Sequence, residues 1–123
     1  MATPSSTKIL VIEDEPAIAR AHGRVLSRLL DGCEITTVNS AALAIAELSS
    51  GTSFALILSD FDLIGAGTGG DVLLWVRAQA PATPFLFCSG NEAIEMLGVP
   101  YIAKPCFPNE LRAAIVAAMG VAS

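Results

Sequence analysis

The chain has 123 residues, the size of one ordinary domain, and 53% of them are hydrophobic. No uninterrupted apolar run approaches the length of a membrane span, so this composition favours a soluble α/β protein with buried strands and no membrane partner. The net charge of −5, with only seven Lys and Arg residues, argues against direct binding to nucleic acid.

The N-terminal segment, residues 1–7, is short and polar and lacks the hydrophobic core of a secretion signal. We expect it to be a disordered lead-in to a single domain over residues 8–120. Cys33, Cys88 and Cys106 are odd in number and show no metal-ligand spacing. Because Cys88 lies inside an apolar run, we expect a small buried hydrophobe there and not a reactive thiol. A reducing cytoplasm is the natural compartment for such a chain.

The first half of the chain alternates apolar runs with amphipathic stretches, which is typical of a doubly wound parallel sheet. A strand over residues 8–12 precedes a helix that begins at Pro16 and ends before Asp31. A short β-branched strand follows over residues 34–38, and Ser40 is the expected N-cap of the next helix. The expected inward faces are Ile18, Ala21, Val25 and Leu29 in the first helix, and Ala41, Ala44, Ile45 and Leu48 in the second.

The second half continues the same pattern. A strand over residues 54–59 runs into a glycine-rich turn at 65–70, and a helix over about 71–79 precedes the strand at 85–88. Between Ser89 and Tyr101 there is room only for a short helix, over residues 92–97. A strand at 101–103 leads to a last helix whose expected inward face comprises Leu111, Ala114, Ile115, Ala118 and Met119.

Polar residues close four of these apolar runs: the pair Glu13-Asp14, then Asp60, Ser89 and Lys104. The carboxyl ends of parallel strands share one edge of an open sheet, and ligands bind there. Carboxylates brought together repel one another unless a cation intervenes, and Mg²⁺ suits a few carboxylates and a phosphate oxygen. We therefore predict a metal and phosphoryl site, with unrelated solvated acids as the alternative.

The chemistry of these groups suggests a role for each. Asp60 is the candidate nucleophile, because a carboxylate can accept a phosphoryl group as an acyl phosphate. Glu13, Asp14 and Asp60 form the proposed cage for Mg²⁺, Lys104 supplies a mobile positive charge, and Ser89 donates to a phosphoryl oxygen. The Lys104–Pro105 peptide bond is a candidate for the cis isomer, which could turn the ammonium group inward.

This order of motifs resembles a response-regulator receiver domain of the CheY-like superfamily, over residues 8 to about 119. The resemblance implies a flavodoxin-like, doubly wound sheet of five parallel strands in the order 2-1-3-4-5, with five helices on its two faces. The short stretch between Ser89 and Tyr101 implies a reduced fourth helix. The resemblance also implies a signalling domain and not an enzyme, with catalysis limited to its own phosphotransfer and slow dephosphorylation.

Carried over to this chain, the resemblance implies that Asp60 takes a phosphoryl group from a phosphohistidine on a sensor histidine kinase or a histidine phosphotransfer protein. Asp14 and Asp60 would bind Mg²⁺ directly, Glu13 through water, and Asp62 through its backbone carbonyl. Ser89 and Tyr101 would be the switch residues, biased by local electrostatics. The sequence contains no effector domain, so we expect the output to pass to an unknown downstream protein, or the chain to be a fragment of a larger regulator or hybrid kinase.

Three departures from the family pattern stand out. The first acid is Glu13, where Asp is commoner, and Ile64 occupies the place of a usual proline. Asp62 and Asn91 lie at positions that tune dephosphorylation in the family, so the phosphoryl lifetime is left open. A plain edge aromatic is the alternative for Tyr101.

Two other classes of function remain as alternatives. Asp60 and Asp62 resemble the nucleophile and acid of a haloacid-dehalogenase phosphatase, in which Asp62 could protonate a leaving group. Against it, that family expects its aspartate pair near the chain start and a further acidic motif after the lysine. A pseudo-receiver that no longer accepts phosphate is the other alternative. His22 falls on a polar flank of the first helix, where an ordinary surface imidazole is expected and a phosphorelay histidine is the alternative.

Overall fold

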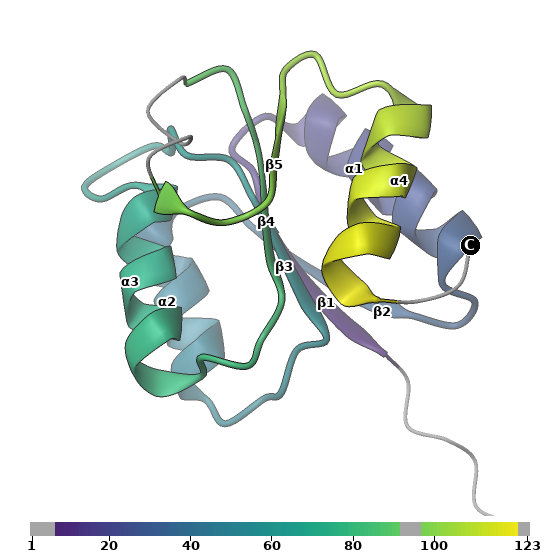
Figure 1. The fold of residues 1–123 in the computed structure, drawn as a ribbon. Coiled ribbons are helices and arrows are strands. Elements are labelled where there is room, and N and C mark those ends of the chain that lie inside the picture. The colour runs from purple at the N-terminus through teal and green to yellow at the C-terminus, as the bar shows by residue number, and fades with distance from the viewer. Residues whose placement is uncertain (1–6, 92–96, 121–123) are drawn as a thin grey trace, which may run out of the picture.

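The computed structural model describes residues 7–91 and 97–120. Within these ranges there are five strands and four helices. They alternate along the chain up to the fourth strand, after which the described residues give the fifth strand and then the last helix (Figure 1). The strands are β1 (Lys8–Ile12), β2 (Glu34–Val38), β3 (Leu56–Ser59), β4 (Phe85–Ser89) and β5 (Tyr101–Ala103). The helices are α1 (Pro16–Leu29), α2 (Ala41–Ser49), α3 (Gly69–Gln79) and α4 (Pro108–Met119).

All strand pairs are parallel, and the sheet order is β2-β1-β3-β4-β5. The predicted doubly wound topology is therefore confirmed. The predicted lead-in lies outside the described residues except for Thr7, and so does the predicted short helix over residues 92–97 except for Leu97. None of the helices in the described ranges is both long and apolar enough to cross a bilayer.

The helices cover both faces of the sheet, α2 and α3 on one and α1 and α4 on the other (Figure 1). Side chains alternate between these faces along β1: Leu10 and Ile12 join the core beneath α2 and α3, whereas Ile9 and Val11 join the core beneath α1 and α4. All four are fully buried, as expected of a central parallel strand.

Local signals place most helix ends where the sequence predicted them. Pro16 begins α1, and the Ser40 hydroxyl accepts a hydrogen bond from the Leu43 amide at 3.2 Å, which caps α2. Helix α3 begins two residues earlier than expected because Thr68 and Asp71 form a capping box.

The inward face of α1 differs from the prediction. Ala19, His22 and Leu26 are its buried residues, whereas Ala21 is exposed and Ile18 is only half-buried. The predicted apolar stripe lies one position before the buried one, because the prediction counts His22 as a polar surface residue. The expectation of a surface imidazole was wrong, since His22 is only 4% exposed. The faces predicted for α2 and α4 are confirmed, with Ala44, Leu111 and Ile115 among their buried residues.

Candidate functional site

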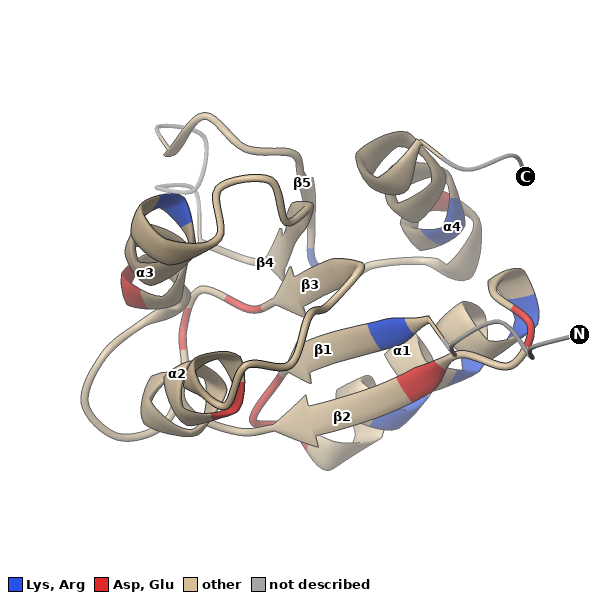
Figure 2. Cartoon of the chain, turned by 90° about the horizontal axis from the view of Figure 1, so that it is seen from below, with Lys and Arg blue, Asp and Glu red and all other residues tan. Residues whose placement is uncertain are grey.

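Sheet register brings the predicted site residues to one edge. Ile12 pairs with Ser59, and the Asp60 amide donates to the Ile12 carbonyl at 2.9 Å, so the acids of β1 and β3 follow side by side. On the other side, Ser89 pairs with Ala103, and Lys104 follows. Figure 2 shows acidic segments beyond the arrowheads of β1 and β3.

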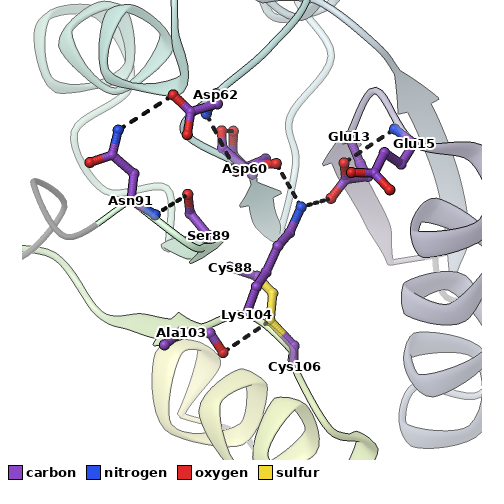
Figure 3. A network of polar contacts seen from close by, with 11 residues as sticks. Glu13, Glu15, Asp60, Asp62, Cys88, Ser89, Asn91, Ala103, Lys104 and Cys106 are labelled. Carbon is purple, nitrogen blue, oxygen red and sulfur yellow. Dashed lines mark hydrogen bonds and ion pairs between the residues drawn. A yellow bond between two sulfur atoms is a disulfide. The ribbon is translucent and has the colours of Figure 1, made fainter.

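Lys104 joins the two acidic strand ends, as Figure 3 shows. Its Nζ lies 2.7 Å from Asp60 Oδ2 and 2.9 Å from Glu13 Oε1. The Lys104–Pro105 peptide bond, the candidate for the cis isomer, is cis. Glu13 and Asp60 are both buried, at 3% and 7% exposure, so the ammonium group neutralises charges that water reaches poorly.

Burial and charge shift the pKa values of two of these groups. Burial raises the pKa of Glu13 above its ordinary value, although the hydrogen bond and charge of Lys104 act in the opposite direction. Burial alone would lower the pKa of Lys104, but Asp60 and Glu13 together outweigh it and raise that pKa. Lys104 is therefore firmly cationic at neutral pH.

The loop after β3 holds Asp60 from the other side. The Asp62 amide donates to Asp60 Oδ1 at 3.3 Å, and the buried Ser59 hydroxyl donates to the Asp60 carbonyl at 2.7 Å. A Cβ at Gly69 would overlap the carbonyl oxygen of Asp60, so only glycine lets α3 begin this close to the phosphoacceptor candidate. From the sequence, this glycine is predicted only as part of the glycine-rich turn at residues 65–70.

Ser89 and Asn91 lie across Asp60 from Glu13 (Figure 3). Ser89 is buried, and its hydroxyl accepts a hydrogen bond from the Asn91 amide at 3.2 Å. The Asn91 side chain donates to Asp62 Oδ1 at 3.4 Å, so the two residues proposed to tune dephosphorylation contact each other. Tyr101 lies on the edge strand β5 with 40% of its surface exposed.

The donor set fits a hard cation. Glu13 Oε1 is a buried oxygen whose close contact within the described residues is the ion pair with Lys104 Nζ at 2.9 Å. Carboxylate oxygens of Glu13, Asp14 and Glu15 lie within 4.8 Å of one another. Asp60 is not part of that group, and the Lys104 ammonium contacts both Asp60 and Glu13. Glu13, Asp14 and Asp60 could hold Mg²⁺ through such oxygens.

Glu15 is a further neighbour of the site that was not predicted from the sequence. Its amide donates to Glu13 Oε2 at 3.2 Å. The signal was present as a run of three consecutive acids, but only the first two were assigned to the site.

The cysteine prediction requires a correction. Cys88 is buried as expected, yet it forms a disulfide bond with Cys106, and Cys33 is the free cysteine. The Cα atoms of Cys88 and Cys106 are 6.6 Å apart, within the range found in disulfides. The pairing depends on β4 and the loop after β5 lying side by side, which the spacing of the cysteines does not reveal.

Comparisons with known proteins agree with this geometry. The profile of the family described as response regulator receiver domain matches residues 9–116. The chain therefore belongs to the response regulator receiver family of two-component signalling. This membership favours the receiver interpretation over the phosphatase alternative.

Individual relatives point to the same family. The chain is 33% identical, over 92% of its length, to the alginate biosynthesis transcriptional regulatory protein AlgB of Pseudomonas syringae pv. tomato. It spans about a quarter (26%) of that relative.

Solved structures share the fold. A response regulator receiver protein from Sinorhizobium medicae superposes with a TM-score of 0.83 at 24% identity, covering 95% of this chain and 97% of that one. A CheY-like receiver domain from Methanospirillum hungatei gives 0.81 at 24% identity, covering 94% and 95%.

Proposed function

We propose that this chain is a Mg²⁺-dependent phosphoacceptor receiver in which Asp60 accepts a phosphoryl group from a phosphohistidine on a partner protein. The observation that carries the proposal is the contact of Lys104 Nζ with Asp60 Oδ2 at 2.7 Å, inside a cluster of buried carboxylates. A buried carboxylate beside an ammonium group is suited to accept a phosphoryl group whose charge that ammonium can then neutralise.

The transfer step balances without a further reactant. The P–N bond to the donor imidazole breaks, its electron pair stays on that nitrogen, and a P–O bond forms to an Asp60 carboxylate oxygen. When bound, Mg²⁺ would supply positive charge to the phosphoryl oxygens and orient them. Glu13, Asp14 and Asp60 are the residues proposed to hold it, together with the backbone carbonyl of Asp62.

The residues around Asp60 have separate tasks in this proposal. Lys104, now paired with both Glu13 and Asp60, would turn its charge to the transferred group. Ser89, buried beside Asp60, would donate its hydroxyl to a phosphoryl oxygen. The resulting shift of Ser89, with Tyr101 as its proposed follower on β5, would change the surface that a downstream protein binds.

The partners and compartment are proposals of the same kind. A sensor histidine kinase or a histidine phosphotransfer protein would donate the phosphoryl group, and the cytoplasm is the proposed location. AlgB is a transcriptional regulatory protein, so one proposed output of this receiver is control of transcription, exerted through a partner or another part of a longer protein.

The test uses acetyl phosphate as donor, with Mg²⁺, and follows intact protein mass. We expect the wild-type protein to gain one phosphoryl group and Asp60→Asn to gain none. Asp62→Asn is the matched control, because it removes a carboxylate two residues away and should still be modified. An adduct that persists in Asp60→Asn, or no adduct on the wild type, would contradict the proposal. Hydrolysis of a phosphate monoester that Asp62→Asn abolishes would instead support the phosphatase alternative.

A further inference from the structure

A second group of potential ligands lies beneath the acidic edge and has no part in the proposed function. His22 of α1, Cys88 of β4 and Cys106 of the loop before α4 place one ring nitrogen and two sulfur atoms within 4.8 Å of one another. We name these three residues the thiol–imidazole cluster. They come from three segments far apart in sequence, so their approach is a product of the fold.

His22 is the unusual member. Only 4% of its surface is exposed, and its Nδ1 has no hydrogen-bond partner within the described residues. A buried polar atom without a partner lowers the stability of the fold, and a ligand bound to the imidazole would satisfy that atom. Imidazole nitrogen is among the commonest metal ligands in proteins.

A cavity of about 520 Å³ opens beside the cluster. His22, Cys88 and Cys106 line it together with Lys104 and residues on the first two turns of α1. Three protein ligands at the wall of a cavity leave a further coordination position for water or a small anion, which is the arrangement of an open zinc site.

We propose that the thiol–imidazole cluster, once its disulfide is reduced, binds a thiophilic divalent cation of the Zn²⁺ type. Two thiolates and an imidazole are ligands that Zn²⁺ favours, and Mg²⁺ disfavours them. Zn–S bonds of about 2.3 Å place ligand atoms roughly 3.5–3.8 Å apart, a spacing compatible with the 4.8 Å limit within which these atoms already lie.

The cluster has an oxidised and a reduced form, and only the reduced form can bind the cation. With a phosphine as reductant, the Cys88–Cys106 bond takes up two electrons and the two protons of a water molecule and becomes two thiols. The phosphine takes the oxygen of that water and becomes its oxide. Cation binding then releases the two thiol protons to solvent. In a reducing compartment the pair would be in the form that binds.

A cation bound to the thiol–imidazole cluster would also affect the neighbouring acidic edge, because the two lie side by side. Cys88 directly precedes Ser89, and Cys106 follows Lys104 by two residues. Figure 3 shows the Cys88–Cys106 pair next to the Lys104 side chain that reaches up to Asp60. A bound cation would therefore tie α1, β4 and the β5–α4 loop together beside two residues of the proposed phosphoryl site.

The test is a titration of phosphine-reduced protein with Co²⁺, a spectroscopic substitute for Zn²⁺, in excess Mg²⁺ to saturate the acidic edge. We expect a thiolate-to-cobalt charge-transfer band that saturates at one equivalent and is displaced by Zn²⁺. Cys106→Ser and His22→Gln should each weaken binding by about tenfold or more. Cys33→Ser, which removes the free cysteine, and Asp60→Asn, which alters the acidic edge, should leave the band and its affinity unchanged.

Several results would overturn the proposal. A thiol titration checks the starting material: it should count one free thiol in the oxidised protein and three after reduction. Absence of the band from fully reduced protein would show that the pair serves as a disulfide alone. A band unaffected by Cys106→Ser, or one lost in Asp60→Asn, would place the cation elsewhere. Circular dichroism of each variant checks folding, and His22→Gln provides the test if Cys106→Ser does not fold.

Discussion

Two clusters of potential ligands lie next to each other in this domain and differ in almost every chemical respect. The acidic cluster, Glu13, Asp14 and Asp60, is made of hard oxygen ligands at the strand ends, with Lys104 as counter-charge. The thiol–imidazole cluster is made of soft sulfur and nitrogen ligands beneath α1. Residues at the end of β4 belong to both surroundings: Ser89 lies next to the acidic cluster, and Cys88 is part of the thiol–imidazole cluster.

The two clusters also differ in how far their positions can be predicted from the sequence. Every member of the acidic cluster closes an apolar run, and parallel topology brings such positions to one edge, so the chain order was enough to predict that they share this edge. The cis bond before Pro105 and the cap at Ser40 follow from equally local signals.

The thiol–imidazole cluster gave no such signal. His22 reads as a polar residue on a surface helix until the packing of α1 shows that it lies in line with Ala19 and Leu26. Cys88 and Cys106 are 18 residues apart, and only the side-by-side arrangement of β4 and the loop after β5 joins them. Long-range packing of this kind cannot be read from spacing or periodicity.

The largest expected effect concerns Lys104, which contacts the acidic cluster and lines the neighbouring cavity. We expect Lys104→Ala to slow phosphorylation by acetyl phosphate about 100-fold, since it removes the charge that would stabilise the transferred group. Mg²⁺ affinity should be unchanged or higher, because the ammonium group no longer occupies the space between Glu13 and Asp60. Stopped-flow phosphorylation and a Mg²⁺ titration measure the two quantities. Equal loss of both would argue against the phosphoryl role.

The disulfide should make a measurable contribution to stability in the oxidised protein. Closing a loop of 18 residues predicts a loss of about 3 kcal/mol in the free energy of unfolding for Cys106→Ser, measured by urea denaturation. Cys33→Ser is the control and should change stability little. If reduced wild-type protein and Cys106→Ser both match the oxidised protein, then the covalent link does not stabilise the fold.

The burial of His22 predicts that the free energy of unfolding depends on pH through the thiol–imidazole cluster. Burial, and to a smaller extent the charge of Lys104, lower the pKa of His22 to about 4. Because the folded state resists protonation, His22 contributes stability that is full above about pH 6.5 and is lost as pH falls toward 4. The expected loss is about 2–3 kcal/mol by pH 4.5.

Denaturation at several pH values, with His22→Gln as the comparison, isolates this contribution. The variant should have a flatter stability profile across that window than the wild-type protein. Identical slopes for the two proteins would mean that His22 is reached by water and titrates normally.

The smallest effect is expected at the rim of the acidic cluster. Asp62 is exposed and accepts a hydrogen bond from the Asn91 side chain. Asp62→Asn therefore changes charge near the phosphoryl group but keeps the backbone carbonyl that is proposed to bind Mg²⁺. We expect the lifetime of the phosphorylated protein to change by about threefold, which corresponds to roughly 0.6 kcal/mol. Loss of bound phosphate over time measures it, and a change of 100-fold would give Asp62 a direct part in hydrolysis.

The most direct test of the central claim is fluorine NMR of the protein with beryllofluoride, a phosphoryl analogue, in the presence and absence of Mg²⁺. A phosphoacceptor Asp60 beside a Mg²⁺ site predicts bound fluorine resonances that require Mg²⁺, disappear in Asp60→Asn and persist in Cys106→Ser. Bound resonances that survive Asp60→Asn, or that form equally well without Mg²⁺, would contradict it.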